Sequence, residues 1–309
     1  MRVAVLGATG FIGKYVAGQL GAAGHEVIGL HRGRAPVSDT AMRSMVVDRH
    51  DVPALARALA DSAPGVLVDL IAYTADEVAD LLTALPPSVH RLVLVSSGDV
   101  YRTYDAFRGV VPPMEVPAPL PETAPLRQQL YPYRAQATGP GDLEYSYEKI
   151  LVERAARTGS RVPVTILRLP MVYGPGDRQQ RVGSYLRRLA AVTAVFRLND
   201  REASWRCTRG YVEDVAWAIS LSATDLRAAS QVFNVGEADA LAEIEWAGAI
   251  AETIAWKGRI IADPAEPASL QAEWSVPLVS DTRRIRQVLE YREPVGRAEG
   301  LRRAVAAAA

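Results

Sequence analysis

The residues with the clearest capacity for chemistry are a tyrosine and a lysine four positions apart, Tyr145 and Lys149. The run 143–158 around them has helix-forming composition, and residues four apart in a helix lie on one face, one turn from each other. An ammonium beside a phenol lowers the pKa of the phenol, which can then exchange a proton with a substrate oxygen. The spacing predicts an acid–base pair on one helical face, with Tyr147 packing elsewhere. The alternative is a surface helix whose lysine extends into solvent.

The basic residues are mostly arginines, and the chain of 309 residues has only three lysines: Lys14, Lys149 and Lys257. A compact ammonium tunes a phenol and reaches ribose hydroxyls in ways that a planar guanidinium does not, so Lys149 stands out. The formal net charge is zero. This balance favours a small-molecule partner over a nucleic acid or an anionic membrane.

A glycine-rich turn at the N-terminus predicts a dinucleotide site. The strand expected at 3–6 is followed by Gly7-Ala-Thr-Gly10-Phe-Ile-Gly13 and then by a helix. In this context the glycines permit a tight turn and a close approach to a pyrophosphate, which the free N–H groups of the helix start can bind. The expected contacts are Gly7, Thr9, Gly10, Phe11, Ile12 and Gly13.

The second expected strand, 26–30, leads to Arg32 and Arg34 where a fold that binds NAD usually has an acidic residue. Arginine suits the 2′-phosphate of NADP, so NADP is the expected cofactor, with NAD as the alternative. The competing interpretation is that both arginines are solvated loop charges. Asp48 could accept from the adenine amino group, and further contacts are expected at other strand ends: Arg49, Ile71, Ala72 and Leu169.

The alternation of strands and helices predicts the fold class. Buried strands expected at 65–72, 91–95 and 164–169 alternate with helices, as in a parallel sheet covered on both faces. We expect an α/β, Rossmann-type doubly wound sheet over 1–170, with a long proline-rich loop at 102–142. A smaller α/β substrate-binding subdomain would occupy 171–309, with about 210–235 returning to the sheet.

Several classes are excluded or disfavoured. The single cysteine, Cys207, cannot form an internal disulfide, and no Cys/His array accompanies it, so no metal site is expected. There is no apolar run near 18 residues, and the N-terminus enters a strand pattern at once, so we expect a cytoplasmic protein.

The ordered motifs resemble the extended short-chain dehydrogenase/reductases, the NAD-dependent epimerase/dehydratase family, over nearly the whole chain. The resemblance rests on the glycine turn together with the following segments: Asp48, Ser96-Ser97-x-x-Val100-Tyr101, Tyr145-x-x-x-Lys149, Arg168, Val172-Tyr-Gly-Pro-Gly-Asp177, Arg209-Gly-Tyr-Val-Glu-Asp214 and Phe233-Asn-Val-Gly236.

The resemblance implies roles for these residues. Tyr145 would be the acid/base, Lys149 would lower its pKa, and Ser97 would hydrogen-bond the same substrate oxygen. The nicotinamide would carry the hydride to or from a hydroxyl or ketone carbon of a sugar-nucleotide-like or other polar substrate. The family also implies a homodimer.

Departures from the family pattern concern the substrate. Met171 stands where sugar-nucleotide epimerases usually have an asparagine, which weakens a nucleotide-sugar assignment. We expect substrate contacts from Asp99, Met171, Arg206 and Arg209, although structural pairing is an equal alternative for each arginine. An acid at Asp99 would also suit a dehydratase, against the simpler interpretation of a loop carboxylate.

A second functional class is a non-catalytic nicotinamide-binding regulator or RNA-interacting scaffold of the same fold. Such relatives commonly lose the tyrosine–lysine pair or the serine, whereas this chain keeps all three, and its neutral charge does not favour RNA. The sequence therefore favours catalysis.

Overall fold

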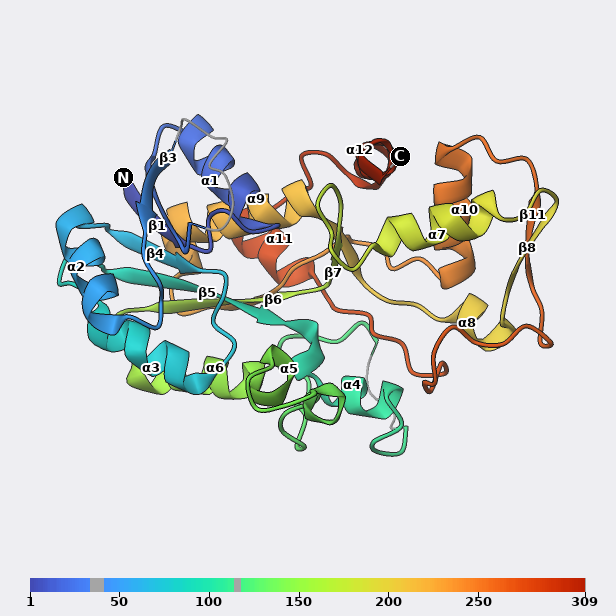
Figure 1. Ribbon diagram of the computed structural model, residues 1–309, viewed down its shortest axis with the longest axis horizontal. Coiled ribbons are helices and arrows are strands. Elements are labelled where there is room, and N and C mark those ends of the chain that lie inside the picture. Colours follow the sequence, from blue (N-terminus) through green and yellow to red (C-terminus); the bar gives the residue numbers. More distant parts are fainter. Residues whose placement is uncertain (34–41, 114–117, 309) are drawn as a thin grey trace.

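The computed structural model describes residues 1–33, 42–113 and 118–308. In this part of the chain the main feature is a seven-stranded sheet whose strands all run parallel, in the order β10-β6-β5-β4-β1-β2-β3 (Figure 1). The strands are β1 (Arg2–Leu6), β2 (Glu26–His31), β3 (Met42–Val46), β4 (Val66–Asp69), β5 (Arg91–Ser97), β6 (Val164–Leu169) and β10 (Val232–Asn234). The predicted Rossmann-type α/β fold is confirmed.

Two hydrophobic cores lie on opposite faces of the sheet. Along β1, Val3 and Val5 belong to one core while Ala4 and Leu6 belong to the other, because successive strand side chains point to opposite faces. One face is covered by α1 (Gly13–Ala22), α9 (Val212–Thr224) and α11 (Arg283–Leu289). The other face is covered by α2 (Val52–Ser62), α3 (Ala75–Ala84) and α6 (Lys149–Gly159). Both faces are therefore buried, as the near-continuous apolar strands require.

The second half of the chain adds two small sheets and further helices (Figure 1). β7 (Met171–Tyr173) pairs with β9 (Arg209–Tyr211), and β8 (Val195–Leu198) pairs with β11 (Arg259–Ala262). The helices around them are α7 (Arg181–Ala190), α8 (Asp200–Ser204), α10 (Glu243–Thr253) and α12 (Arg297–Ala308). After β9 the chain returns to the large sheet through α9 and β10, while a boundary at residue 170 stays a prediction.

The proline-rich segment is more ordered than a loop. It contains α4 (Arg102–Phe107) and a single 3₁₀ turn at Arg134–Gln136, and α5 (Leu143–Ser146) follows it. Its bridge between Tyr101 and Leu126 and the bond from Arg127 N to Val100 O hold it against the end of β5. No helix in the described ranges has the length and hydropathy needed to cross a membrane.

Candidate active site

Lys149 is fixed under the carboxyl edge of the sheet. Its Nζ donates to the carbonyl oxygens of Ala72, just beyond β4, at 2.6 Å and of Val95, in β5, at 2.9 Å. The side chain is 3% exposed. Burial lowers the pKa of Lys149 to about 8, since desolvation penalises the ammonium. The charge is therefore held at one place, with a pKa within the range useful for acid–base chemistry.

The predicted continuous helix over 143–158 is wrong. The first helix, α5, ends at Ser146. The backbone of Tyr147 and Glu148 is not helical, and α6 begins at Lys149. The cause is Glu148, whose carboxylate caps α6 by accepting from Ile150 N at 2.8 Å. The same carboxylate accepts from Tyr131 N at 2.6 Å and pairs with Arg127 at 3.1 Å. The contacts of Glu148 with the proline-rich segment thus separate α5, which ends at Ser146, from α6, which begins at Lys149.

Because the helix is interrupted, Tyr145 does not share a helical face with Lys149, and that prediction is corrected. Tyr145 is 36% exposed. Its ring lies against the guanidinium of Arg134, 4.7 Å from the ring centroid, and Arg134 Nε donates to its carbonyl oxygen at 2.8 Å. These contacts belong to a surface residue.

Tyr147 is the tyrosine that reaches the site, although the sequence predicted a packing role for it. Its hydroxyl donates to Asp99 Oδ2 at 2.8 Å, and the Ser97 hydroxyl lies within hydrogen-bonding reach and acts to lower its pKa. The Nζ of Lys149 lies 5.9 Å from the centroid of the Tyr147 ring. Sequence spacing alone favoured the other tyrosine, and the structural signal for Tyr147 is the break at Glu148.

Asp99 connects two tyrosines at the site. The hydroxyl of Tyr133 donates to the same Oδ2 at 2.9 Å, and Arg127 Nε donates to the Asp99 carbonyl oxygen. Burial raises the pKa of Asp99, and the hydrogen bonds from the tyrosines oppose this rise. The pKa of Tyr147 is well above its usual value, first because it is buried and then because it faces Asp99. Tyr147 is consequently held as a protonated phenol.

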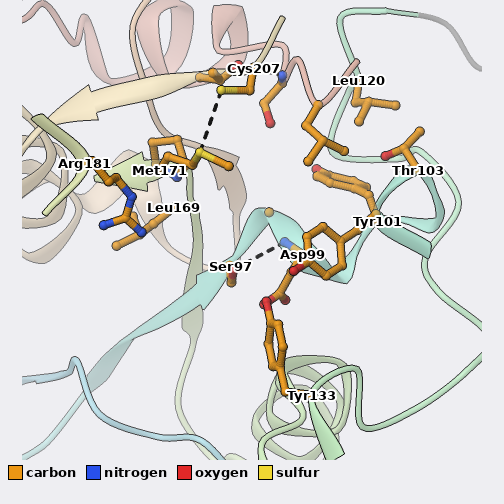
Figure 2. Close-up of a pocket in the computed structure, with 16 residues that line it drawn as sticks. Ser97, Asp99, Tyr101, Thr103, Leu120, Tyr133, Leu169, Met171, Arg181 and Cys207 are labelled. Carbon is orange, nitrogen blue, oxygen red and sulfur yellow. Dashed lines mark hydrogen bonds between the residues drawn. The ribbon is translucent and has the colours of Figure 1, made fainter. Parts of the chain in front are cut away.

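A cavity of about 170 Å³ opens beside these groups (Figure 2). Of the predicted site residues, the structure brings Ser97, Asp99, Leu169 and Met171 to its wall. Four lining residues come from the segment 102–142 that was predicted to be a loop: Thr103, Tyr104, Leu120 and Tyr133. The remaining lining residues are Gly98, Tyr101, Pro170, Arg181, Cys207, Thr208, Leu278 and Ser280.

Arg206 and Arg209, predicted to bind substrate, are not among these lining residues. Arg206 pairs with Glu245 at 3.1 Å on the surface. Arg209 is buried, pairs with Glu243 and lies 4.5 Å from the centroid of the Trp246 ring. The prediction for these two arginines is corrected, since both are paired with glutamates away from the cavity, Arg206 on the surface and Arg209 in the interior.

The glycine turn has the geometry that a dinucleotide requires. Gly7 has φ +91°, and a Cβ at Gly13 would lie 2.1 Å from the Gly7 carbonyl oxygen. Helix α1 has no side-chain cap at Ile12 and no acidic residue in its first turn. Its first N–H groups therefore suit an anion, and these residues, with the half-buried Thr9 and Phe11 in the turn, fit a pyrophosphate.

The other predicted cofactor contacts differ in their environments. Arg32 is exposed just after β2, and Asp48 is exposed with its Oδ1 accepting from His50 N at 3.0 Å. Arg34 lies outside the described residues. Arg49 is buried in a bidentate pair with Asp69, at 3.1 and 3.2 Å. Because its guanidinium is engaged within the protein, the prediction that the Arg49 side chain contacts the cofactor is corrected.

Ile71 and Ala72 follow β4, beside the glycine turn. A Cβ on Gly7 would lie 2.8 Å from Ile71 Cγ2, which shows how closely the two loops approach. Ala72 is fully buried and uses its carbonyl oxygen for Lys149. Both residues therefore lie between the glycine turn and the acid–base group.

Comparisons with known proteins concern the family and the fold. The family model described as NAD dependent epimerase/dehydratase family matches residues 3–84 and 78–236. A curated protein from Streptomyces kanamyceticus, 2′-dehydrokanamycin reductase, is 26% identical over 289 residues, which cover 91% of this chain and 72% of that protein.

Solved structures show the same fold. The UDP-glucose 4-epimerase of Thermus thermophilus, in complex with NAD, is 22% identical with a TM-score of 0.68, covering 100% of this chain and 99% of that one. A putative epimerase from Burkholderia cenocepacia J2315 is 24% identical with a TM-score of 0.73, covering 99% and 97%. At these identities the likeness establishes the fold.

Proposed function

Because the chain belongs to the NAD dependent epimerase/dehydratase family, and so is an enzyme that uses a nicotinamide dinucleotide, we propose that it transfers a hydride at a hydroxyl or ketone carbon of a sugar-like polar substrate, with Tyr147 as the acid/base. The observation that supports this proposal is the position of the Tyr147 hydroxyl, which donates to Asp99 and lies within reach of Ser97, two residues that line the cavity. This assignment replaces Tyr145 by Tyr147.

The chain's own residues supply the proton chemistry. A bound nicotinamide would supply or accept the hydride. Tyr147 would donate its proton to the substrate oxygen while the Ser97 hydroxyl hydrogen-bonds that oxygen, and Lys149 would stabilise the resulting phenolate. We propose that the enzyme works as a ketone reductase: hydride adds to the carbonyl carbon and the Tyr147 proton to the carbonyl oxygen.

The name of the curated relative, 2′-dehydrokanamycin reductase, supports reduction of a sugar ketone. Epimerisation is the second candidate, supported by the names of the proteins in the solved structures. It would use Tyr147 as a base in its oxidation step and as an acid in its reduction step. The non-catalytic regulator or scaffold is not proposed, because Ser97, a tyrosine and Lys149 are all present at one site.

For the cofactor we propose NADP, which rests on Arg32 and on the absence of an acidic residue directly after β2 in the described part of the chain. We also propose a homodimer, on the family resemblance alone. Sedimentation equilibrium of the purified chain tests it, and a monomer at micromolar concentration contradicts it.

The acid/base assignment is tested with two tyrosine variants. Tyr147→Phe should lower kcat for reduction of keto-sugars by about 100-fold or more, since general acid catalysis contributes about that much. Tyr145→Phe is the matched control and should retain activity within about twofold. Oxidation of NADPH is followed by absorbance, and NADPH affinity by fluorescence titration. Full activity of Tyr147→Phe, or loss confined to Tyr145→Phe, refutes the assignment.

A further inference from the structure

Two buried polar atoms at the cavity wall have no hydrogen-bond partner among the described residues. They are Asp99 Oδ1 and Thr103 Oγ1, on side chains that are 7% and 4% exposed. Leaving such an atom unpaired costs about 1–3 kcal/mol, so native proteins rarely leave two together. Both residues line the same cavity, one in the turn after β5 and the other in α4 (Figure 2). A bound group that donates hydrogen bonds would satisfy both atoms.

The cavity is small. Its volume of about 170 Å³ is close to the roughly 150 Å³ that accommodates one benzene ring in an engineered protein cavity. Pockets for larger ligands measure about 300–1,000 Å³. The space beside Ser97 and Asp99 therefore fits one six-membered ring.

The cavity also offers no unpaired cation. Arg181 is the one basic side chain among its described lining residues. It already donates to Asp177 Oδ1 at 2.9 Å and to the Val172 carbonyl oxygen at 3.0 Å. Arg206 and Arg209 are paired with glutamates. A diphosphate, which favours unpaired guanidinium or ammonium groups, would lack its usual partners here.

We propose that this cavity binds a single sugar-like ring that bears hydroxyl or amino groups and carries no nucleotide diphosphate. Asp99 Oδ1 and Thr103 Oγ1 accept hydrogen bonds from the ring substituents next to the reacting carbon. The proposal rests on the proposed function, which puts that carbon beside Ser97 and Tyr147. This substrate class differs from the one in the names of two structural neighbours, which are UDP-glucose 4-epimerases.

Equilibrium binding to the full chain with bound NADP⁺ tests this proposal without turnover. The probes are methyl α-glucopyranoside, its 2-amino-2-deoxy analogue, UDP-glucose and UDP, measured by ligand-observed NMR and calorimetry. Both glycosides should bind, and UDP-glucose should bind no more tightly than they do. Tenfold tighter binding of UDP-glucose or UDP, or no measurable binding of either glycoside, overturns the proposal.

Variants at Thr103 make the test specific. Thr103→Val, nearly isosteric, should raise the Kd of the glycosides about tenfold, the effect of one lost hydrogen bond of about 1.4 kcal/mol. Thr103→Ser keeps the hydroxyl and should restore binding, and Thr158→Val on the exposed side of α6 is the control. Thermal melting shows that each variant is folded. Unchanged affinity in folded Thr103→Val overturns the proposal.

The two proposals fail separately. Because the readout is binding, it does not depend on which tyrosine transfers the proton. Full activity of Tyr147→Phe would refute the proposed mechanism and leave the ring site standing, whereas tight UDP-glucose binding would refute the ring site and leave the mechanism standing.

Discussion

Among single residues, Arg32 has the most direct bearing on cofactor choice. It follows β2 with its side chain exposed, at the place where the adenosine ribose meets the sheet in this fold. Its neighbour His31 is buried and engaged with Ser44 Oγ at 2.7 Å and with Gly33 N, so His31 is already satisfied within the protein. Among the described residues that directly follow β2, Arg32 is therefore the basic side chain available for the proposed 2′-phosphate.

Replacing Arg32 by alanine should raise the Kd of NADPH about tenfold and change that of NADH little, because only NADPH presents the phosphate. Fluorescence titration measures both constants. Arg57→Ala, an exposed arginine on α2, is the matched control and should affect neither. Equal weakening of the two cofactors by Arg32→Ala would contradict an interaction with the phosphate.

Among the elements, the joint between α5 and α6 decides which tyrosine enters the site. Glu148 is 1% exposed and combines a helix cap, a backbone contact to Tyr131 and an ion pair with Arg127. Its own N–H donates to the Tyr73 carbonyl oxygen at 2.9 Å. The non-helical backbone at 147–148 turns Tyr147 toward Asp99.

Replacing Glu148 by alanine should destabilise the protein by about 3–5 kcal/mol, because it leaves the Arg127 charge buried and unpaired. Urea unfolding measures this loss, and Glu144→Ala, exposed on α5, is the control. The variant should also lose reductase activity under conditions where it remains folded. Wild-type stability of Glu148→Ala would show that the joint does not depend on this carboxylate.

The sheet could be predicted from sequence because its signals are local. The glycine turn, the apolar strands and the alternation with helices each lie within about ten residues, and each leads to the element found. The site was less predictable because the position of Tyr147 depends on Glu148, whose partners Arg127 and Tyr131 lie 21 and 17 positions earlier in the chain. Helical periodicity cannot predict a contact between residues so far apart in the sequence. Arg49, Arg206 and Arg209 were misassigned for the same reason, since their partners are distant in sequence.

In the whole molecule, Asp214 joins the C-terminal segment to the dinucleotide half. Its carboxylate accepts from Val295 N at 2.8 Å and from Gly296 N at 3.0 Å, directly before α12. The same helix, α9, packs on α1, where Gln19 Nε2 donates to the Glu213 carbonyl oxygen at 2.8 Å. The helix that follows the glycine turn and the C-terminal segment are thus connected through α9.

Burial raises the pKa of Asp214 to about 6, above the value of about 3.9 in an unfolded chain. Between these values the folded protein binds the proton that the unfolded chain has released, so this residue makes stability fall as the pH rises from about 4 to 6. Urea unfolding across that range should show a weaker fall in Asp214→Asn than in the wild type. Asp200→Asn, on the surface of α8, should follow the wild type. Identical pH dependence in all three chains would contradict this role.

The anchoring of Lys149 limits how the ammonium can act. An ammonium has three N–H donors, and two are directed at the carbonyl oxygens of Ala72, just beyond β4, and of Val95, in β5. One N–H remains without an acceptor among the described residues. Lys149 can therefore donate to a single further acceptor, and the position of its ammonium depends on both β5 and the segment that follows β4.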